Sequence, residues 1–163
     1  MKKKPQVSIV MGSDSDLPVM KEASAVLREF SIPHEVRILS AHRSPDMTSV
    51  FAKGARKKGI KVIIAGAGGA AHLAGVIASH TTLPVIGVPM ETKLDGIDSL
   101  LSTVQMPSGV PVATVSIGKA GAVNAAILAA QIIGANNAAI GKKVGTYKKK
   151  LVRKIREKNR KLK

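Results

Sequence analysis

Five short runs of apolar, mostly β-branched residues recur along the chain: Val7–Met11, Val36–Leu39, Val62–Ala65, Val85–Val88 and Val112–Val115. Each run is nearly continuous in apolar residues, which is typical of a strand buried on both faces. The longer segments between and after them predict helices over Leu17–Phe30, Asp46–Lys58, Ala70–Ser79, Asp98–Val104 and Ala120–Gly134. Five such strand–helix units in succession predict the α/β class, a parallel sheet with helices on both faces.

Two helix starts carry the residues that usually cap them. Asp16 precedes the first predicted helix, with Pro18 in its first turn, and Ser44 precedes Pro45 at the start of the second. A short polar side chain followed by proline is typical of a helix N-terminus, so Asp16 and Ser44 are the predicted N-caps.

The chain contains 163 residues and no cysteine. This length fits one domain, predicted over residues 1–140, followed by a basic helical tail over 141–163. The absence of cysteine excludes a thiolate nucleophile, a zinc–thiolate site and a disulfide framework, and it fits a reducing compartment. Met1–Lys4 resembles the charged start of a signal peptide, but only Val7–Met11 follow before the next acidic residues, too few for an export segment. We therefore expect a cytoplasmic protein without a membrane partner.

The net charge of +16 is concentrated at one end of the chain. Residues 142–163 hold 12 Lys and Arg and a single acid, Glu157, so the other 141 residues carry a balance of only +5. Single-strand binding needs aromatic side chains on which bases stack, and the whole chain has three aromatic residues, Phe30, Phe51 and Tyr147. Specific nucleic-acid binding is therefore not expected.

Polar or glycine-rich segments follow the first three predicted strands. These segments are Gly12–Asp16, Ser40–Pro45 and Ala65–His72. In an open parallel sheet, ligands bind beyond the carboxyl ends of the strands. The three segments should open on the same edge of the sheet, and this convergence predicts the functional site.

The first two segments suit a phosphorylated sugar. Gly12–Asp16 offers hydroxyl groups and backbone N–H groups at a helix start, which favour a phosphate, while Asp16 could instead accept hydrogen bonds from ribose hydroxyls. In the second segment, His42 can move a proton near neutral pH, and the adjacent Arg43 suits a phosphate. The alternative is that both are ordinary polar loops before helices.

The third segment allows two interpretations. Gly66, Gly68 and Ala71 match a dinucleotide-binding fingerprint, and Glu91 follows at a distance. The fingerprint normally follows the first strand of a unit, whereas this one follows the third. Alternatively, the small residues bring bare backbone close to a flat ligand. His72 either faces that ligand or is a satisfied histidine at a helix start. The four histidines are far apart in the sequence, so no metal site is expected.

Several long motifs in order carry a resemblance to a known family. They are Val10–Asp16, Ser40–Asp46, Ile64–Leu73, Pro84–Pro89, Asp98–Ser102 and Val104–Pro107. With these motifs, the chain resembles the 5-(carboxyamino)imidazole ribonucleotide mutases of de novo purine synthesis from about Val7 to Gly134. The resemblance implies a flavodoxin-like three-layer sandwich with a five-stranded parallel sheet of order 2-1-3-4-5. It also implies an octamer with sites at subunit boundaries.

The resemblance also implies an activity and roles for the site residues. The family moves a carboxylate from the exocyclic nitrogen of the ribonucleotide to a ring carbon, without metal, ATP or biotin, so no cofactor is expected. His42 corresponds to the general acid/base, Ser13 and Asp16 to substrate-binding positions, and Arg43 to the phosphate-binding arginine. The remaining predicted pocket residues are Ser15, Ser40, Ala41, Gly68 and His72.

Two positions depart from the family pattern, and two other functions remain as alternatives. Ala74 stands where the family commonly has proline, and Ser44 where threonine is usual. Within the family, the alternative is direct carboxylation of aminoimidazole ribonucleotide with carbon dioxide. The retained His42-Arg43 pair and the Gly68–His72 segment favour the mutase. Outside the family, the alternative is a dinucleotide-binding module.

The basic tail has its own pattern. Val144, Tyr147, Leu151 and Ile155 are spaced by three, four and four residues, which predicts one apolar stripe along a helix. Like charges cover the rest of that helix, so we expect it to be ordered only by packing on the body or on a neighbouring subunit. Arg156–Lys163 should fray into solvent.

Overall fold

The computed structural model describes residues 4–162 and has five parallel strands in one sheet. The strands are β1 (Val7–Met11), β2 (His34–Ile38), β3 (Val62–Ala67), β4 (Val85–Pro89) and β5 (Ala113–Thr114). Their order is β2-β1-β3-β4-β5, so the predicted order 2-1-3-4-5 is confirmed. All neighbouring strands pair in parallel, as the strand–helix alternation predicted.

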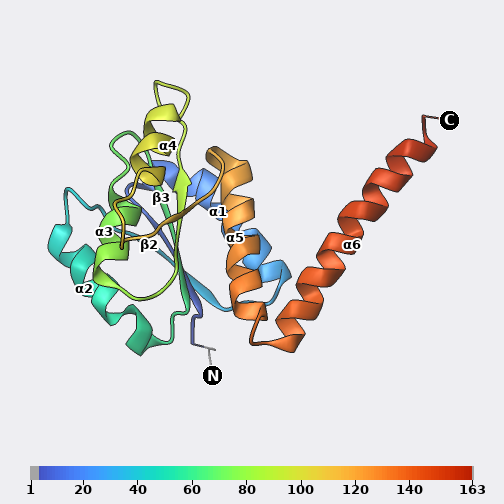
Figure 1. The fold of residues 1–163 in the computed structure, drawn as a ribbon, viewed down its shortest axis with the longest axis horizontal. Coiled ribbons are helices and arrows are strands. Elements are labelled where there is room, and N and C mark those ends of the chain that lie inside the picture. The colour runs from blue at the N-terminus through green and yellow to red at the C-terminus, as the bar shows by residue number, and fades with distance from the viewer. Residues whose placement is uncertain (1–3, 163) are drawn as a thin grey trace.

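Helices cover both faces of this sheet, giving three layers (Figure 1). On one face, α1 (Leu17–Glu29) and α5 (Gly118–Gly134) pack in a core with Ile9, Ile64 and Ile86. On the other face, α2 (Pro45–Ala55) and α3 (Leu73–His80) pack in a second core with Val10 and Ile63. The helix α4 (Ile97–Val104) packs beside β4 and β5.

The edge strand β2 differs from the expectation that every strand is buried on both faces. Val36 is 45% exposed and Ile38 is 56% exposed, whereas all of β1, β3 and β4 is buried. The reason is position: β2 pairs only with β1, so its outer side lies open to solvent.

Asp16 and Ser44 stand at the predicted N-cap positions of α1 and α2, each with proline in the first turn, but neither side chain makes a capping hydrogen bond. Asp16 belongs to a 3-10 turn, Asp14–Asp16, and the capping side chain is that of Ser13, which accepts from the Ser15 N–H. The hydroxyl of Ser44 bonds back to the backbone of Ser40 and caps no N–H of α2. Both side chains therefore stabilise the loops before the helices.

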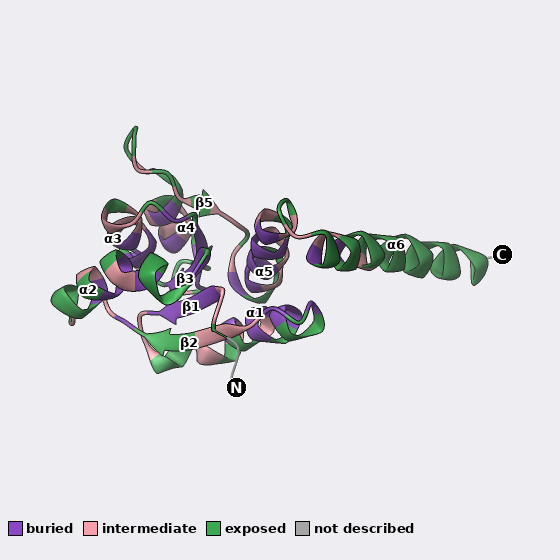
Figure 2. Cartoon of the chain, turned by 90° about the horizontal axis from the view of Figure 1, so that it is seen from below, coloured by how far each residue is buried: buried purple, intermediate pink, exposed green. Residues whose placement is uncertain are grey.

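The last helix, α6 (Ala138–Arg160), projects away from the body (Figures 1 and 2). Its first turns pack on the α1–α5 core through Ile140 and Val144, which are buried, and Tyr147, which is partly buried. The predicted fraying from Arg156 is wrong, because the helix continues to Arg160; Lys163 lies outside the described residues. The division into residues 1–140 and 141–163 stays a prediction.

Within residues 4–162, no helix is both long and apolar enough to cross a bilayer. Most of the charged segment that resembles a signal-peptide start, Met1–Lys3, lies outside the described residues.

Candidate active site

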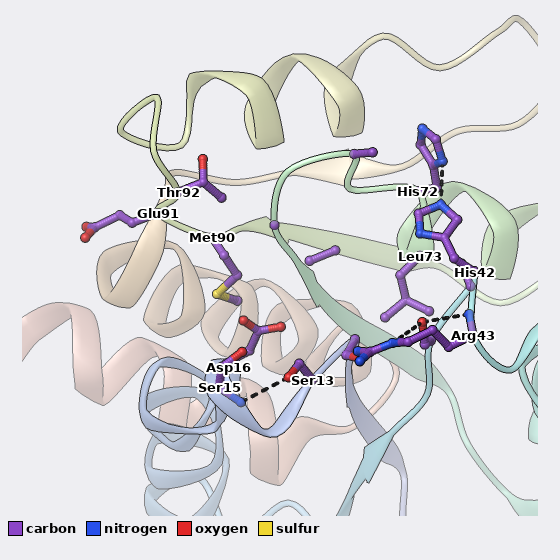
Figure 3. Close-up of a pocket in the computed structure, with 16 residues that line it drawn as sticks. Ser13, Ser15, Asp16, His42, Arg43, His72, Leu73, Met90, Glu91 and Thr92 are labelled. Carbon is purple, nitrogen blue, oxygen red and sulfur yellow. Dashed lines mark hydrogen bonds between the residues drawn. The ribbon is translucent and has the colours of Figure 1, made fainter.

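A cavity of about 460 Å³ lies at the carboxyl ends of β1, β3 and β4 and under the loop that follows β2 (Figure 3). The segments predicted from the sequence converge there, as the rule for open parallel sheets requires. All nine predicted site residues line this cavity: Ser13, Ser15, Asp16, Ser40, Ala41, His42, Arg43, Gly68 and His72. Their chemical roles stay predictions.

The loop after β1 contributes a carboxyl group next to two hydroxyls. Asp16 is half-buried, and burial raises the pKa of this carboxyl above its ordinary value of 3.8. Hydrogen bonds from the Ser13 backbone and the Ser15 side chain partly oppose this rise in the pKa. A ligand hydroxyl that donates a hydrogen bond to this carboxylate, such as a hydroxyl of a ribose, would stabilise its charged form.

The loop after β2 is held closed by serine–backbone bonds. The Ser40 N–H donates to Ser44 Oγ at 3.0 Å, and that hydroxyl donates to the Ser40 carbonyl at 3.0 Å. Arg43 then reaches across to the first loop, where its Nη2 donates to the Gly12 carbonyl at 2.8 Å. The guanidinium therefore lies between the two loops with further N–H donors available, which suits a phosphate bound at the start of the first helix.

The imidazoles of His42 and His72 form a pair. His42 Nε2 lies 2.8 Å from His72 Nδ1, and the rings meet edge to face with centroids 4.9 Å apart. In such a pair one ring nitrogen donates and the other accepts, so each ring constrains the tautomer of the other. His72, for which the sequence allowed two roles, touches the predicted general acid/base directly.

The glycine loop after β3 forms one wall of the cavity with Ala67, Gly68 and Ala70. Gly69 adopts a positive φ of 62°, and its N–H and carbonyl are held by Ser99 and Ser102 of α4, at 2.9 and 3.3 Å. These two serines belong to the Asp98–Ser102 motif. The α4 helix therefore fixes the shape of the loop.

The dinucleotide interpretation of this loop fits the structure poorly. Gly66 is buried, and a Cβ there would lie 2.5 Å from Met90 Cε and 2.6 Å from Met20 Sδ. Methionine side chains, rather than open space for a pyrophosphate, therefore occupy the surroundings of Gly66. Helix α3 also begins only at Leu73, whereas the fingerprint opens directly into a helix.

The sequence analysis missed one wall of the cavity, the segment that follows β4. Met90, Glu91 and Thr92, directly after β4, also line the cavity. Thr92 donates a hydrogen bond to Asp98, and this bond is the main cause that lowers the pKa of the Asp98 carboxyl. The sequence contained the necessary signal, because the rule that ligands bind beyond the carboxyl ends of parallel strands applies to the fourth strand as well as to the first three.

Taken together, the cavity offers a guanidinium and a helix start for an anion, a carboxyl for sugar hydroxyls and an imidazole pair for proton transfer. Small residues line the wall formed by the third loop. Among residues 4–162, no three His, Asp or Glu side chains gather in a way that could hold a metal ion. This arrangement suits a phosphorylated ribose carrying a flat ring that gains or loses a proton.

Comparison with known proteins agrees with this geometry. The model of the AIR carboxylase family matches residues 6–154. The chain belongs to the AIR carboxylase family. The N5-carboxyaminoimidazole ribonucleotide mutase of Pyrococcus horikoshii is 59% identical over 160 residues, covering 98% of this chain and 89% of that protein. The enzyme of the same name from Thermotoga maritima is 58% identical over 159 residues, covering 97% and 92%.

A solved structure extends the likeness to the fold. The crystal structure of Treponema denticola PurE superposes with a TM-score of 0.89 at 31% sequence identity, covering 98% of this chain and 99% of that one. The AIR carboxylase family and the flavodoxin-like fold predicted from the motifs are both confirmed. The matched region also includes α6 as far as Lys154, beyond the end of the recognised motifs.

Proposed function

We propose that the chain is an N5-carboxyaminoimidazole ribonucleotide mutase of purine biosynthesis. It moves the carboxylate of 5-(carboxyamino)imidazole ribonucleotide from the exocyclic nitrogen to the ring carbon, giving 5-amino-1-(5-phosphoribosyl)imidazole-4-carboxylate. Relatives that carry this name match nearly the whole chain, which supports transfer of the complete activity.

One observation carries the proposal: the His42–His72 pair and the Arg43 guanidinium line the same cavity, on the loop after β2 and the loop after β3. A substrate whose phosphate binds Arg43 at the Gly12–Asp16 loop would extend its ring across the cavity. Asp16 lines the same cavity and would accept from the ribose hydroxyls. The cavity thus offers one group each for the phosphate, the sugar and the imidazole of the substrate.

The proposed reaction needs one group that moves a proton. The carbamate C–N bond breaks, carbon dioxide leaves, and the electron pair stays on the nitrogen, which takes up a proton. The ring carbon then attacks the carbon dioxide through a new C–C bond and loses its own proton. The net change moves one proton from carbon to nitrogen, and His42 is the proposed shuttle. Ala67, Gly68 and Ala70 would confine the carbon dioxide between the two steps.

The proposal extends to assembly and location. We infer a homo-octamer in the cytoplasm that acts on a small ribonucleotide, without a cofactor and without specific nucleic-acid binding. The resemblance supports the octamer, and the absence of cysteine fits a reducing compartment.

The experiment is turnover of the carbamate substrate with and without added bicarbonate. A mutase should be equally fast in both, because the carboxylate that leaves the nitrogen is the one that reaches the ring. The matched reaction contains aminoimidazole ribonucleotide and bicarbonate. If only that second mixture reacts, the chain is a direct carboxylase, the alternative that the family description also names.

A further inference from the structure

The loop after β3 and the segment after β4 meet directly along one side of the cavity. A Cβ placed on Gly68 would lie 3.1 Å from Thr92 Cγ2 and 3.3 Å from Met90 Cβ, so only the hydrogen of glycine fits there without displacing a neighbour. Gly68 and Thr92 both line the cavity. This contact between Gly68 and the Met90–Thr92 segment is the seam. In Figure 3, Thr92 lies on the side of the cavity opposite the imidazole pair.

The first two turns of α4 hold both sides of the seam. On one side, Ser99 Oγ accepts from the Gly69 N–H at 2.9 Å, and Ser102 Oγ donates to the Gly69 carbonyl at 3.3 Å. On the other side, Thr92 Oγ1 donates to Asp98 Oδ1. Thr92 is the main cause that lowers the pKa of the Asp98 carboxyl, and hydrogen bonds from the Ser99 backbone and side chain add to this effect. Asp98 and Ser99 therefore join two walls of the cavity to one helix.

The hydroxyl of Ser99 has the most specific task in this arrangement. Ser99 is completely buried, and among residues 4–162 its Oγ is the one acceptor that the Gly69 N–H has. The Gly69 carbonyl, in contrast, accepts from the Ala71 N–H as well as from Ser102. Leaving a donor without its partner costs more than an average hydrogen bond contributes to stability. Loss of the Ser99 hydroxyl should therefore release the loop, whereas loss of the Ser102 hydroxyl leaves the carbonyl bonded.

The seam borders the volume that the small residues of the third loop leave open. In the proposed reaction, carbon dioxide is free in this volume between its release and its capture. It is small and carries no charge, so no side chain can hold it by an ion pair, and only closed walls can retain it. A gap at the seam would give it a path to solvent.

We propose that Ser99 is a positioning residue that keeps the seam closed, so that the ring carbon captures the carbon dioxide before it escapes. Asp98 has the same role on the Thr92 side, and neither Asp98 nor Ser99 lines the cavity. This inference rests on the proposed mutase reaction. When the seam opens, the carbamate C–N bond still breaks and the nitrogen takes up its proton, but no C–C bond forms. The products are then aminoimidazole ribonucleotide and free carbon dioxide.

The test measures how the carbamate substrate divides between these two outcomes. The ratio of aminoimidazole ribonucleotide to carboxylated product is determined for each variant, after subtraction of the loss without enzyme. A merely structural defect does not change this ratio, because it lowers the amount of active enzyme and affects both products equally. Ser99→Ala should raise the ratio about tenfold, the effect of one lost hydrogen bond on the opening of the loop. Thr92→Val, which removes the bond to Asp98, should change it in the same direction and keeps the test valid if Ser99→Ala does not fold.

The matched control is Thr103→Val, which removes another buried hydroxyl from the same helix. Thr103 donates to the Ser99 carbonyl at 2.7 Å and does not line the cavity, so this variant should leave the ratio unchanged. A second measurement needs no turnover. Hydrogen exchange in the peptide that spans residues 66–72, read by mass spectrometry, should be faster in Ser99→Ala and unchanged in Thr103→Val.

Four results would count against the proposal. An unchanged ratio in Ser99→Ala would mean that other walls retain the carbon dioxide, and unchanged hydrogen exchange would mean that Ser99 does not hold the loop. An equal rise in Thr103→Val would mean that any loosening of α4 has this effect. An unchanged ratio in Thr92→Val alone would remove the role of Asp98. Failure of the proposed function looks different, because the unsubstituted chain would then form no product from the carbamate, and the retention role would fall with it.

Discussion

Replacing His42 by asparagine separates proton transfer from every other contribution of this residue. His42 is exposed and makes one hydrogen bond among the described residues, to His72. The net contribution of such a bond to stability is about 0.5–1.5 kcal/mol, and an amide at the same position can form another. The fold and the assembly should therefore survive the substitution nearly unchanged.

The effect on turnover should be much larger. General acid–base assistance contributes at least about a hundredfold, which corresponds to about 2.7 kcal/mol of transition-state stabilisation. We expect His42→Asn to lower kcat by that factor in the carbamate assay, with a melting temperature close to that of the unsubstituted chain. The matched control is His80→Asn, at the end of α3, because His80 does not line the cavity. If His42→Asn keeps more than a tenth of the original kcat, His42 is not the proton shuttle.

Three further results are expected. Arg43→Ala should raise KM by about 10- to 150-fold through loss of about 1.5–3 kcal/mol of charge-assisted bonding, and an unchanged KM would exclude Arg43 from phosphate binding. Because burial raises the pKa of Asp16, the folded chain loses stability as the pH rises from 3.8 through that raised pKa. Asp16→Asn should therefore melt slightly higher at pH 7, with no difference below about pH 3.8, while substrate binding weakens; a lower melting temperature at pH 7 would contradict this. Calorimetry should detect no NAD or NADP binding at micromolar concentrations, since methionines fill the space around Gly66.

The fold followed from the sequence because the central strands carry an unambiguous signal. β1, β3 and β4 are buried on both faces, so apolar residues fill nearly every position, with the buried Ser8 as the exception in β1. The strand at each edge was harder to define. β5 has two residues where four were predicted, and β2 is largely exposed, because an edge strand is constrained by fewer neighbours.

The predicted helix starts were inaccurate where residues at the start of a helix belong instead to a loop that shapes the cavity. The third helix was expected from Ala70, since alanine favours helices, but α3 begins at Leu73. Gly69 adopts a left-handed conformation and is bonded to α4, which holds the next residues out of the helix. Asp16 and Ser44 occupy the predicted N-cap positions without capping hydrogen bonds, because their side chains belong to the loops that line the cavity or hold it closed.

The sequence predicted which residues line the cavity but not which of them bond to one another. The rule on strand ends led to three of the four cavity walls, and applying it to β4 would have added Met90–Thr92. The pairing of His42 with His72 has no local signal, since the two residues are thirty positions apart and meet only when β1 lies between β2 and β3.

The small residues of the loop after β3 explain why a cavity exists at this edge of the sheet. In an open parallel sheet the loops line a crevice beyond the carboxyl ends of the strands, and this chain places Ala67, Gly68 and Ala70 there. Because Gly69 is held by buried Ser99, the loop cannot collapse into the space that its small side chains leave open. Below it, Met20 and Met90 fill the volume next to Gly66 with flexible side chains, so the floor is packed while the volume above stays free. The small residues Ala67, Gly68 and Ala70 therefore leave the free volume that the proposed reaction needs for a flat ring and for the carbon dioxide beside it.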